Sequence, residues 1–308
     1  MTLQQMEYIV AVDKYRHYVR AAESCHVTQS TLSSLIQKLE TELDITIFDR
    51  NSHPIKPTIM GETVIKQAKI LLYHASQLKE MVLSEKEQEA GTLRLGIAST
   101  IAPYILPKLF RKLSASHPNI HLTVEEARVP NLIQKLERAE LDVALLATPL
   151  HNKELLEIPI YKEEFVAYIS PSEALYQENE LTMDNLPTEN IWVLQEGYCP
   201  NNGIFSFCSR IKGNASIYEA GSIETLVRIV DENGGYTIIP ELHVPLLTDS
   251  QKAQIRPIIN PSPSREVALV IRRDYVRERL LNILAESITE VVPDYMINSR
   301  LKRFGIKL

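Results

Sequence analysis

The run from Thr58 to about Glu87 limits the fold more than any other feature, because it holds no proline and its only glycine is Gly61. Apolar residues recur along it at spacings of four and three, which is the pattern of a coiled-coil seam. These residues are Val64, Ala68, Leu71, Ala75, Leu78 and Val82. About 30 residues of helix form a rod of roughly 45 Å. A rod with one apolar side needs a partner, so residues 59–88 are predicted to be a linker helix that joins two copies of the chain.

The residues before this rod, 1–58, are predicted to form three short helices and an extended hairpin. The third helix is the clearest, because Thr28 can cap its start and apolar residues then recur on one helical face. That face comprises Leu32, Leu35, Ile36, Leu39 and Leu43, and the outer face holds Gln29, Ser30, Ser33, Ser34, Gln37 and Lys38. Amides and hydroxyls on such a face suit the major groove of DNA. They also suit plain exposure to water, and the pattern alone favours neither reading.

The segment Phe48–Thr58 favours the DNA reading, since it resembles a β-wing whose Arg50, His53 and Lys56 could touch the sugar-phosphate backbone. Overall charge gives no support. The formal net charge is −6 and the sequence pI is about 5.8. Residues 1–58 carry six Lys and Arg against seven Asp and Glu. DNA binding therefore has to rest on geometry rather than on bulk charge.

From Gly91 the pattern changes to alternating strands and helices. Apolar strands are predicted at Leu93–Ala98, Ile120–Val124, Val143–Ala147, Phe165–Ile169, Trp192–Leu194, Tyr236–Ile239 and Val267–Ile271. This alternation is typical of α/β layering around a mainly parallel sheet. We expect one domain over 91–308 with two lobes, the first from about 91–162 and 267–300 and the second from about 163–266. Ligands of such folds bind at strand C-termini and in clefts.

Two of the three cysteines, Cys199 and Cys208, lie nine positions apart and are joined by the turn-forming segment Pro200–Gly203. The N-terminus lacks the features of a secretory signal, and no later run approaches the roughly 18 apolar residues of a membrane span. We therefore expect a cytoplasmic protein. In that reducing compartment a cysteine pair is more often redox-active, catalytic or metal-binding than structural.

Three readings of the pair stay open at this point. Two buried free thiols are the common case, and a metal site lacks a second ligand pair at zinc spacing. A reversible disulfide needs Cα atoms roughly 5.5 Å apart, so the segment must bend. Bending opposes the docking of Ile204, Phe205 and Phe207, which would make the segment a two-state element. No metal and no cofactor are predicted.

Local motifs along the whole chain resemble those of LysR-type transcriptional regulators. They are Tyr8-Ile-Val-Ala-Val, Ala21-Ala-Glu-Ser-Cys-His-Val-Thr-Gln-Ser-Thr-Leu-Ser, Lys38-Leu-Glu and Leu95-Gly-Ile-Ala. The resemblance implies a mixed α+β and α/β chain: a winged helix-turn-helix, a linker helix and a two-lobed regulatory domain like periplasmic binding proteins. Its implied partners are double-stranded promoter DNA, RNA polymerase and further copies of the chain, as a homodimer or homotetramer. The implied DNA contacts are Thr28, Gln29, Ser30, Thr31, Ser33, Gln37, Arg50, His53 and Lys56.

Within that family, the cysteine spacing, the Arg16-His17 pair and the segment Thr100–Pro107 resemble a peroxide-sensing subgroup. By this resemblance hydrogen peroxide is the signal, Cys199 forms the sulfenic acid and Cys208 resolves it to a disulfide. Oxidation then activates oxidative-stress genes.

The resemblance assigns roles to two further residues. Thr100 is the candidate to orient peroxide, and Arg265 is a candidate cation for the thiolate, although it also fits a solvated residue at a strand start. The chain departs from the subgroup at Tyr198, where relatives often have histidine, and at Val129, where some carry a hydroxyl group.

Two other functions are compatible with parts of the sequence. One is a LysR-type regulator that binds a small metabolite between its lobes. The other is an enzyme with Cys199 as nucleophile, which is disfavoured because no His-Asp or His-Asn pair lies near it in the sequence.

Overall fold

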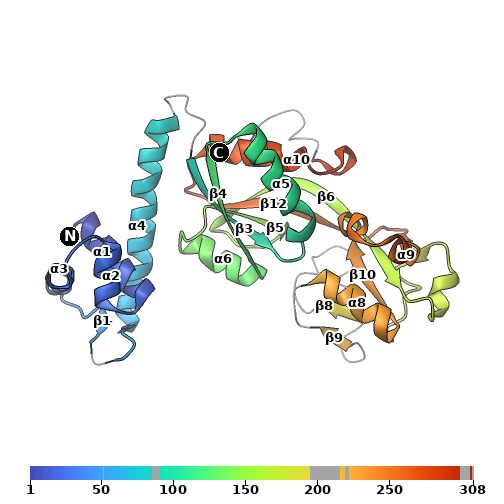
Figure 1. Ribbon diagram of the computed structural model, residues 1–308, viewed down its shortest axis with the longest axis horizontal. Coiled ribbons are helices and arrows are strands. Elements are labelled where there is room, and N and C mark those ends of the chain that lie inside the picture. Colours follow the sequence, from blue (N-terminus) through green and yellow to red (C-terminus); the bar gives the residue numbers. More distant parts are fainter. Residues whose placement is uncertain (51, 85–90, 195–215, 219–221, 299–305, 307–308) are drawn as a thin grey trace. The chain divides into compact units, whose positions relative to one another are not determined.

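The computed structural model describes residues 1–50, 52–84, 91–194, 216–218, 222–298 and 306 (Figure 1). The chain divides at about residue 88 into two compact units, which are described separately. Within the described residues, no helix has the length and apolar character needed to cross a bilayer.

The first unit consists of the predicted helices and hairpin. The elements are α1 (Leu3–Tyr15), α2 (Tyr18–Ser24), α3 (Gln29–Leu43), β1 (Phe48–Asp49), β2 (Lys56–Pro57) and α4 (Ile59–Ser84). Thr2 forms a capping box with Gln5 at the start of α1, and the Thr28 side chain caps α3 as predicted. The buried face of α3 runs from Leu32 to Leu39. Leu43 was predicted to continue this face but is 38% exposed, because α3 ends there and its Asp44 cap turns the chain away.

The predicted seam of α4 divides into two parts. Ala68 is 1% exposed and belongs to the core of this unit, with Val64 packed against it. Ala68 is therefore wrongly placed in a seam between two chains, because α4 packs on α1 and buries it there. Leu71 and Leu78 are 43% and 63% exposed. Ala75 is half-buried, and the side chain of Val82 lies outside the described residues.

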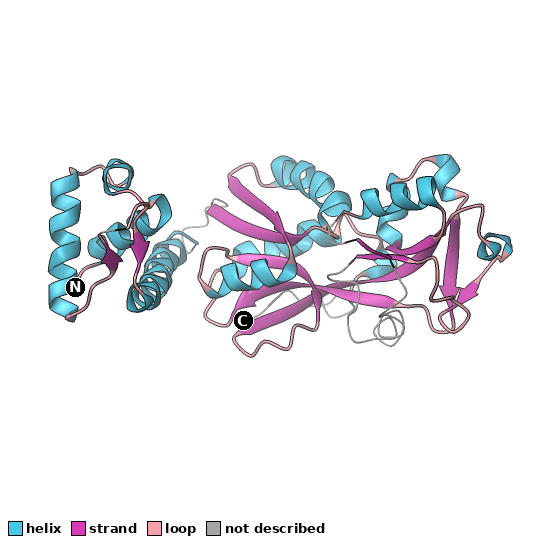
Figure 2. Ribbon diagram, turned by 90° about the horizontal axis from the view of Figure 1, so that it is seen from below, coloured by secondary structure: helices cyan, strands magenta, loops and turns pink. Residues whose placement is uncertain are grey.

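The second unit is built on a sheet in the order β4-β3-β5-β12-β6-β11-β7, with β10 also paired to β6. The strands are β3 (Gly91–Ala98), β4 (Ile120–Ala127), β5 (Val143–Thr148), β6 (Leu155–Ile169), β7 (Leu181–Thr182), β10 (Tyr236–Pro240), β11 (Ile255–Ile259) and β12 (Ser264–Arg272). A separate parallel pair joins β8 (Trp192–Leu194) and β9 (Ser216–Tyr218). Figure 2 shows the long strands of this unit with helices packed along them.

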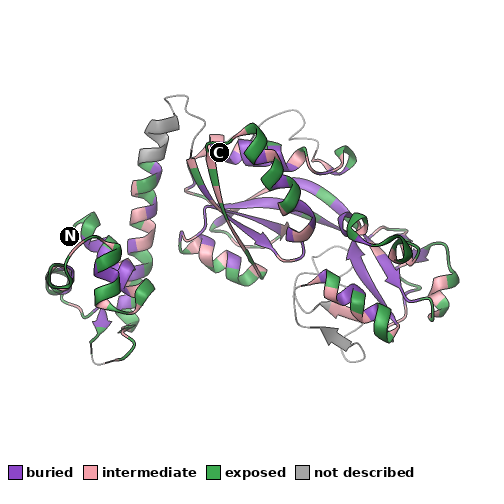
Figure 3. Cartoon of the chain, viewed as in Figure 1, coloured by how far each residue is buried: buried purple, intermediate pink, exposed green. Residues whose placement is uncertain are grey.

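The prediction that this sheet is mainly parallel is wrong. β3 is parallel to β4 and β5, and β11 to β7. β12 runs antiparallel to both β5 and β6, and β6 runs antiparallel to β10 and β11. Strands such as β5 and β12 are buried through most of their length (Figure 3). Burial on both faces gives the continuous apolar run that is typical of parallel strands, but that run carries no information on strand direction.

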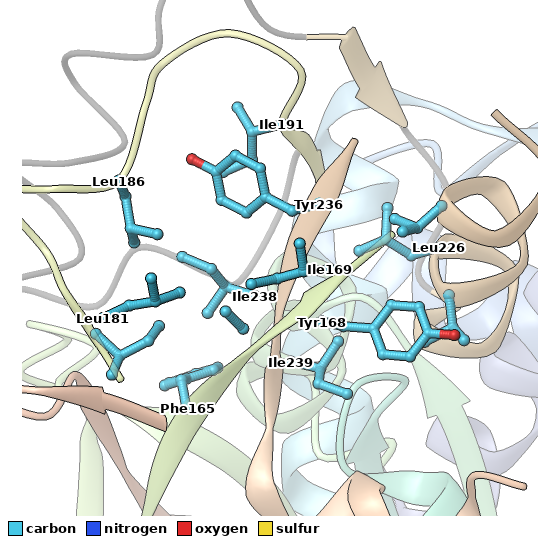
Figure 4. Packing of buried hydrophobic residues seen from close by; sticks show 14 of the residues in the cluster. Phe165, Tyr168, Ile169, Leu181, Leu186, Ile191, Leu226, Tyr236, Ile238 and Ile239 are labelled. Carbon is cyan, nitrogen blue, oxygen red and sulfur yellow. The ribbon is translucent and has the colours of Figure 1, made fainter. Parts of the chain in front are cut away.

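Helices cover this sheet at both ends of the unit. They are α5 (Ala102–Ser116), α6 (Val129–Glu137), α8 (Ile223–Asn233), α9 (Asp249–Lys252) and α10 (Glu278–Thr289), with 3₁₀ turns at Ala174–Gln177, Glu241–Leu246 and Asp294–Met296. One apolar core lies where β6 and β10 pair. Phe165, Tyr168 and Ile169 of β6 gather there with Tyr236 and Ile239 of β10 (Figure 4). β6 thus begins beside β12 and ends in this core, which we call the second apolar core.

A buried ion cluster joins β3, β5 and the start of α10. Asp142, 3% exposed, accepts hydrogen bonds from the backbone N–H of Arg94 (2.8 Å) and from its guanidinium (2.8 and 3.2 Å). Arg277 lies 2.7 Å from the same carboxylate. Burial alone raises the pKa of Asp142, but the bonds from Arg94 and the charges of Arg277 and Arg94 outweigh it, so the pKa lies below its ordinary value.

Asp142→Asn should lower the free energy of unfolding by about 2 kcal/mol at pH 7. Because the folded pKa of Asp142 is lowered, its contribution is present above the unfolded pKa of about 3.9 and is lost as pH falls through the folded pKa. The difference in free energy of unfolding between wild type and Asp142→Asn should therefore become smaller below about pH 4, as measured by urea unfolding. Asp249→Asn, at a fully exposed carboxylate, is the control and should change little. A gap that stays constant down to pH 3 would contradict this account.

Candidate functional site

The third helix presents the polar surface predicted for it. Thr28, Gln29, Ser30, Thr31 and Gln37 are exposed, and Ser33 is half-exposed. The turn before it depends on His26, which adopts a left-handed conformation with φ of 56°. The next residue, Val27, donates its N–H to the Ala22 carbonyl at 3.0 Å, which fixes α2 against the start of α3.

The wing is held to α3 by one carboxylate. Glu40, 9% exposed, accepts hydrogen bonds at Oε1 from the N–H groups of Ile47 (2.7 Å) and Phe48 (3.3 Å). Its Oε2 accepts from the Arg50 guanidinium at 2.9 Å. Arg50, His53 and Lys56 are all exposed. Glu40 therefore fixes the direction of Arg50 while leaving that cation open to solvent, and the sequence pattern missed it because its charge interrupts the buried face of α3.

The Arg16-His17 pair forms the turn between the first two helices. Arg16 ends α1 in a left-handed conformation, and His17 caps α2 through Nδ1. The Arg16 carbonyl accepts the N–H of Ile55 at 3.3 Å. This pair therefore provides a second attachment of the wing, in addition to Glu40.

In the second unit the structure brings two predicted residues together. Arg265 donates through Nη1 to the Thr100 hydroxyl and through Nη2 to the Thr100 carbonyl, both at 3.0 Å. Arg265 is 2% exposed and Thr100 is 7% exposed. The reading of Arg265 as a solvated residue at a strand start is therefore wrong. Its side chain points inward because β12 continues three residues further toward its N-terminus than the predicted strand.

Two residues that the sequence pattern did not identify complete this cluster. Arg265 Nε donates to Glu163 Oε1 at 2.6 Å, and Arg265 Nη2 donates to the Tyr104 hydroxyl at 2.7 Å. That hydroxyl in turn donates to Glu163 Oε1 at 2.9 Å. Arg265 and Glu163 are directly opposite each other on β12 and β6. Tyr104 lies within the Thr100–Pro107 motif and could have been found there, whereas a pairing across 102 residues leaves no local signal for Glu163.

The electrostatics of this cluster follow from its burial. Burial raises the pKa of Glu163, and the Arg265 charge and the hydrogen bonds from Arg265 and Tyr104 only partly oppose that rise. Burial also raises the pKa of Tyr104 well above its usual range. The Phe165 ring lies under the guanidinium, 5.5 Å from its carbon. The result is a dry site in which a fixed cation contacts a hydroxyl-bearing loop.

The cysteine pair and Tyr198 lie outside the described residues. The flanking strand β8 is anchored by Trp192, whose Nε1 donates to the Gly234 carbonyl at 3.0 Å. Thr237 donates its hydroxyl to the Trp192 carbonyl at 2.8 Å. Val129, which stands where some relatives have a hydroxyl group, begins α6 and is half-buried. The third cysteine, Cys25, is a free thiol that packs beside the core of the first unit.

Both units match known protein families. Residues 3–62 match the model of the bacterial regulatory helix-turn-helix protein, lysR family, and residues 86–293 match the LysR substrate binding domain. A hydrogen peroxide-inducible genes activator of Haemophilus influenzae is 35% identical over 276 residues, covering 88% of this chain and 91% of its own length. The Escherichia coli DNA-binding transcriptional dual regulator OxyR is 31% identical and covers 94% of this chain and 95% of its own length.

Solved structures agree with these matches. A full-length OxyR variant from Pseudomonas aeruginosa superimposes with a TM-score of 0.81 at 29% identity, covering 97% of this chain and 98% of that one. OxyR from Porphyromonas gingivalis gives 0.64 at 31% identity, covering 68% of this chain and 96% of that one. With both domains matched in order and the polar helix and wing exposed as predicted, the chain belongs to the LysR family of helix-turn-helix transcriptional regulators, and its relatives include OxyR.

Proposed function

We propose that this regulator senses hydrogen peroxide through reversible formation of a Cys199–Cys208 disulfide and activates oxidative-stress defence genes. The observation that carries the proposal is the direct hydrogen bonding of Thr100 to Arg265, the two residues assigned separately to orient peroxide and to stabilise a thiolate. Relatives named hydrogen peroxide-inducible genes activators match it over nearly their whole length. The regulator acts in the cytoplasm as a homodimer or homotetramer on promoter DNA, together with RNA polymerase.

The proposed chemistry has two displacement steps. The Cys199 thiolate attacks one peroxide oxygen, so that an S–O bond forms, the O–O bond breaks and hydroxide leaves. The Cys208 thiolate then attacks the sulfenic sulfur, so that the S–S bond forms and a second hydroxide leaves. Thr100 Oγ1 accepts a hydrogen bond from Arg265, which leaves its own proton free to be donated to peroxide.

Oxidation with stoichiometric hydrogen peroxide should link the Cys199 and Cys208 peptides within seconds to minutes, seen by non-reducing mass spectrometry, while Cys25 stays reduced. Trp192 is the only tryptophan of the chain, so its fluorescence should change with the same time course. In Cys208→Ser the reaction should stop at a sulfenic acid that a dimedone probe traps. Unreacted or over-oxidised thiols at low peroxide would remove the redox claim, and Cys199→Ser with full induction would favour a metabolite sensor.

DNA affinity should fall steeply with salt in spite of the acidic pI, because phosphate contacts release counterions. Arg50→Ala should weaken binding to promoter and unrelated DNA by a similar factor and reduce the salt slope by about one. Gln29→Ala and Ser33→Ala should instead reduce the preference for the promoter sequence. Lys14→Ala, an exposed cation on α1, is the charge-matched control for Arg50. Affinities that do not depend on salt would contradict the proposed interface.

Assembly should depend on the exposed part of α4. Leu71→Asp and Leu78→Asp should shift the oligomer toward monomer at micromolar concentration in sedimentation velocity, because each places a charge in an apolar seam. Gln67→Asp, also exposed on α4, should not. Ala68→Asp should lower the unfolding temperature of the first unit instead, since Ala68 is buried within it. An oligomer unaffected by both leucine variants would overturn the predicted seam.

A further inference from the structure

The two oxygens of the Glu163 carboxylate have different surroundings. Oε1 accepts from Arg265 at 2.6 Å and from Tyr104 at 2.9 Å. Oε2 is buried and makes no hydrogen bond within the part of the chain that the structure describes. A buried acceptor without a partner costs free energy, so a neutral side chain would be cheaper if only stability mattered. Packing alone therefore does not explain why a carboxylate occupies position 163.

The guanidinium of Arg265 connects Glu163 to Thr100. Its Nε edge holds the carboxylate, while Nη1 and Nη2 reach the Thr100 hydroxyl and carbonyl. Both side chains of the Arg265–Glu163 pair are fully buried, so water does not screen their charges. The positive charge that Arg265 presents at Thr100 is therefore reduced by the carboxylate on its other edge.

We propose that Glu163 is a positioning residue for the reaction with peroxide: it holds the Arg265 guanidinium against Thr100 and limits the positive charge presented there. This inference rests on the function proposed above. In that reaction negative charge moves from the thiolate sulfur to the departing oxygen as the S–O bond forms and the O–O bond breaks. A stronger positive field favours both the thiolate and the leaving hydroxide, so Glu163 sets the reactivity below what Arg265 alone would give.

Other titratable groups face Glu163 from each neighbouring element. They are Arg265 on β12, Tyr104 on α5, Tyr161 on β6 and Glu241 on the 3₁₀ turn Glu241–Leu246. Both tyrosine hydroxyls have pKa values raised well above the usual range by burial, so they stay neutral at working pH. Burial also raises the pKa of Glu241, which is half-buried. Glu163 is thus the carboxylate bonded directly to the cation.

Glu163→Gln is a clean test because glutamine can keep its oxygen at the Oε1 position, where both hydrogen bonds are made. The amide nitrogen then replaces Oε2, which makes none. The pH profile of peroxide oxidation, followed by loss of the reactive thiol, should shift down by about one pH unit, and the rate at pH 6 should rise several-fold. A profile that is unchanged or shifted upward overturns the inference. A wild type that does not react overturns the proposed function instead.

Two matched variants separate charge from placement. Glu164→Gln removes the same charge from the adjacent, exposed residue of β6 and should leave the profile within about 0.3 pH unit of wild type. Glu163→Asp keeps the charge but withdraws the carboxylate by one methylene from Arg265, so the midpoint of the pH profile should stay within about 0.3 pH unit while the maximal rate with peroxide falls several-fold. If Glu163→Gln fails to fold, judged by circular dichroism and unfolding temperature, Glu163→Asp decides the matter. A lower maximal rate at an unchanged midpoint supports the inference, and a rate and midpoint both equal to those of wild type overturn it.

Discussion

Arg265 and Glu163 face each other across β12 and β6 with both side chains fully buried, and the arrangement around Thr100 depends on this pair. Desolvating two charges costs several kcal/mol per ion, which their attraction offsets only when hydrogen bonds satisfy the remaining atoms. Here the guanidinium is satisfied by the bonds that it donates to Thr100 and Tyr104, whereas Oε2 of Glu163 accepts none from the described residues. Replacing both members of such a pair with apolar residues is often neutral. The pair is therefore better explained by what Arg265 does at Thr100 than by stability.

The pair joins two long strands of the second unit. Arg265 lies near the start of β12, which pairs with β6 along its whole length and, from Glu266 to Val270, also with β5. Two residues beyond Glu163, β6 enters the second apolar core at Phe165, whose ring also contacts the guanidinium. Through Thr100 and Tyr104 the same guanidinium contacts the loop after β3 and the start of α5. A change of charge at this point therefore acts on β12, on β6 and on the start of α5.

In the first unit, too, a buried glutamate holds an arginine, but there the arginine is exposed. Glu40 is buried at the end of α3 and fixes the wing backbone, yet its second oxygen holds an arginine that stays exposed. Glu40 fixes where the positive charge of Arg50 lies without burying it. Residues 1–58 can therefore present a cation on the wing although they hold slightly more acidic than basic residues. The acidic balance of residues 1–58 counts against nonspecific attraction to DNA and leaves a geometric interface intact.

Prediction from sequence succeeded where the signal is local and failed where the partner is distant. The faces of α3 and the cap at Thr28 follow from spacings of three and four, and the strands from short apolar runs. Strand direction, the outward turn of Leu43 and the burial of Ala68 depend on what packs against them, which no spacing encodes. Arg265 shows the same limit most clearly. Its residue type suggested a cation for the site, but only the register that places it opposite Glu163 turns a solvated strand-start residue into a buried one. Residue types alone therefore suggested which groups to look for, whereas the burial and charge pairing of Arg265 are properties of the fold.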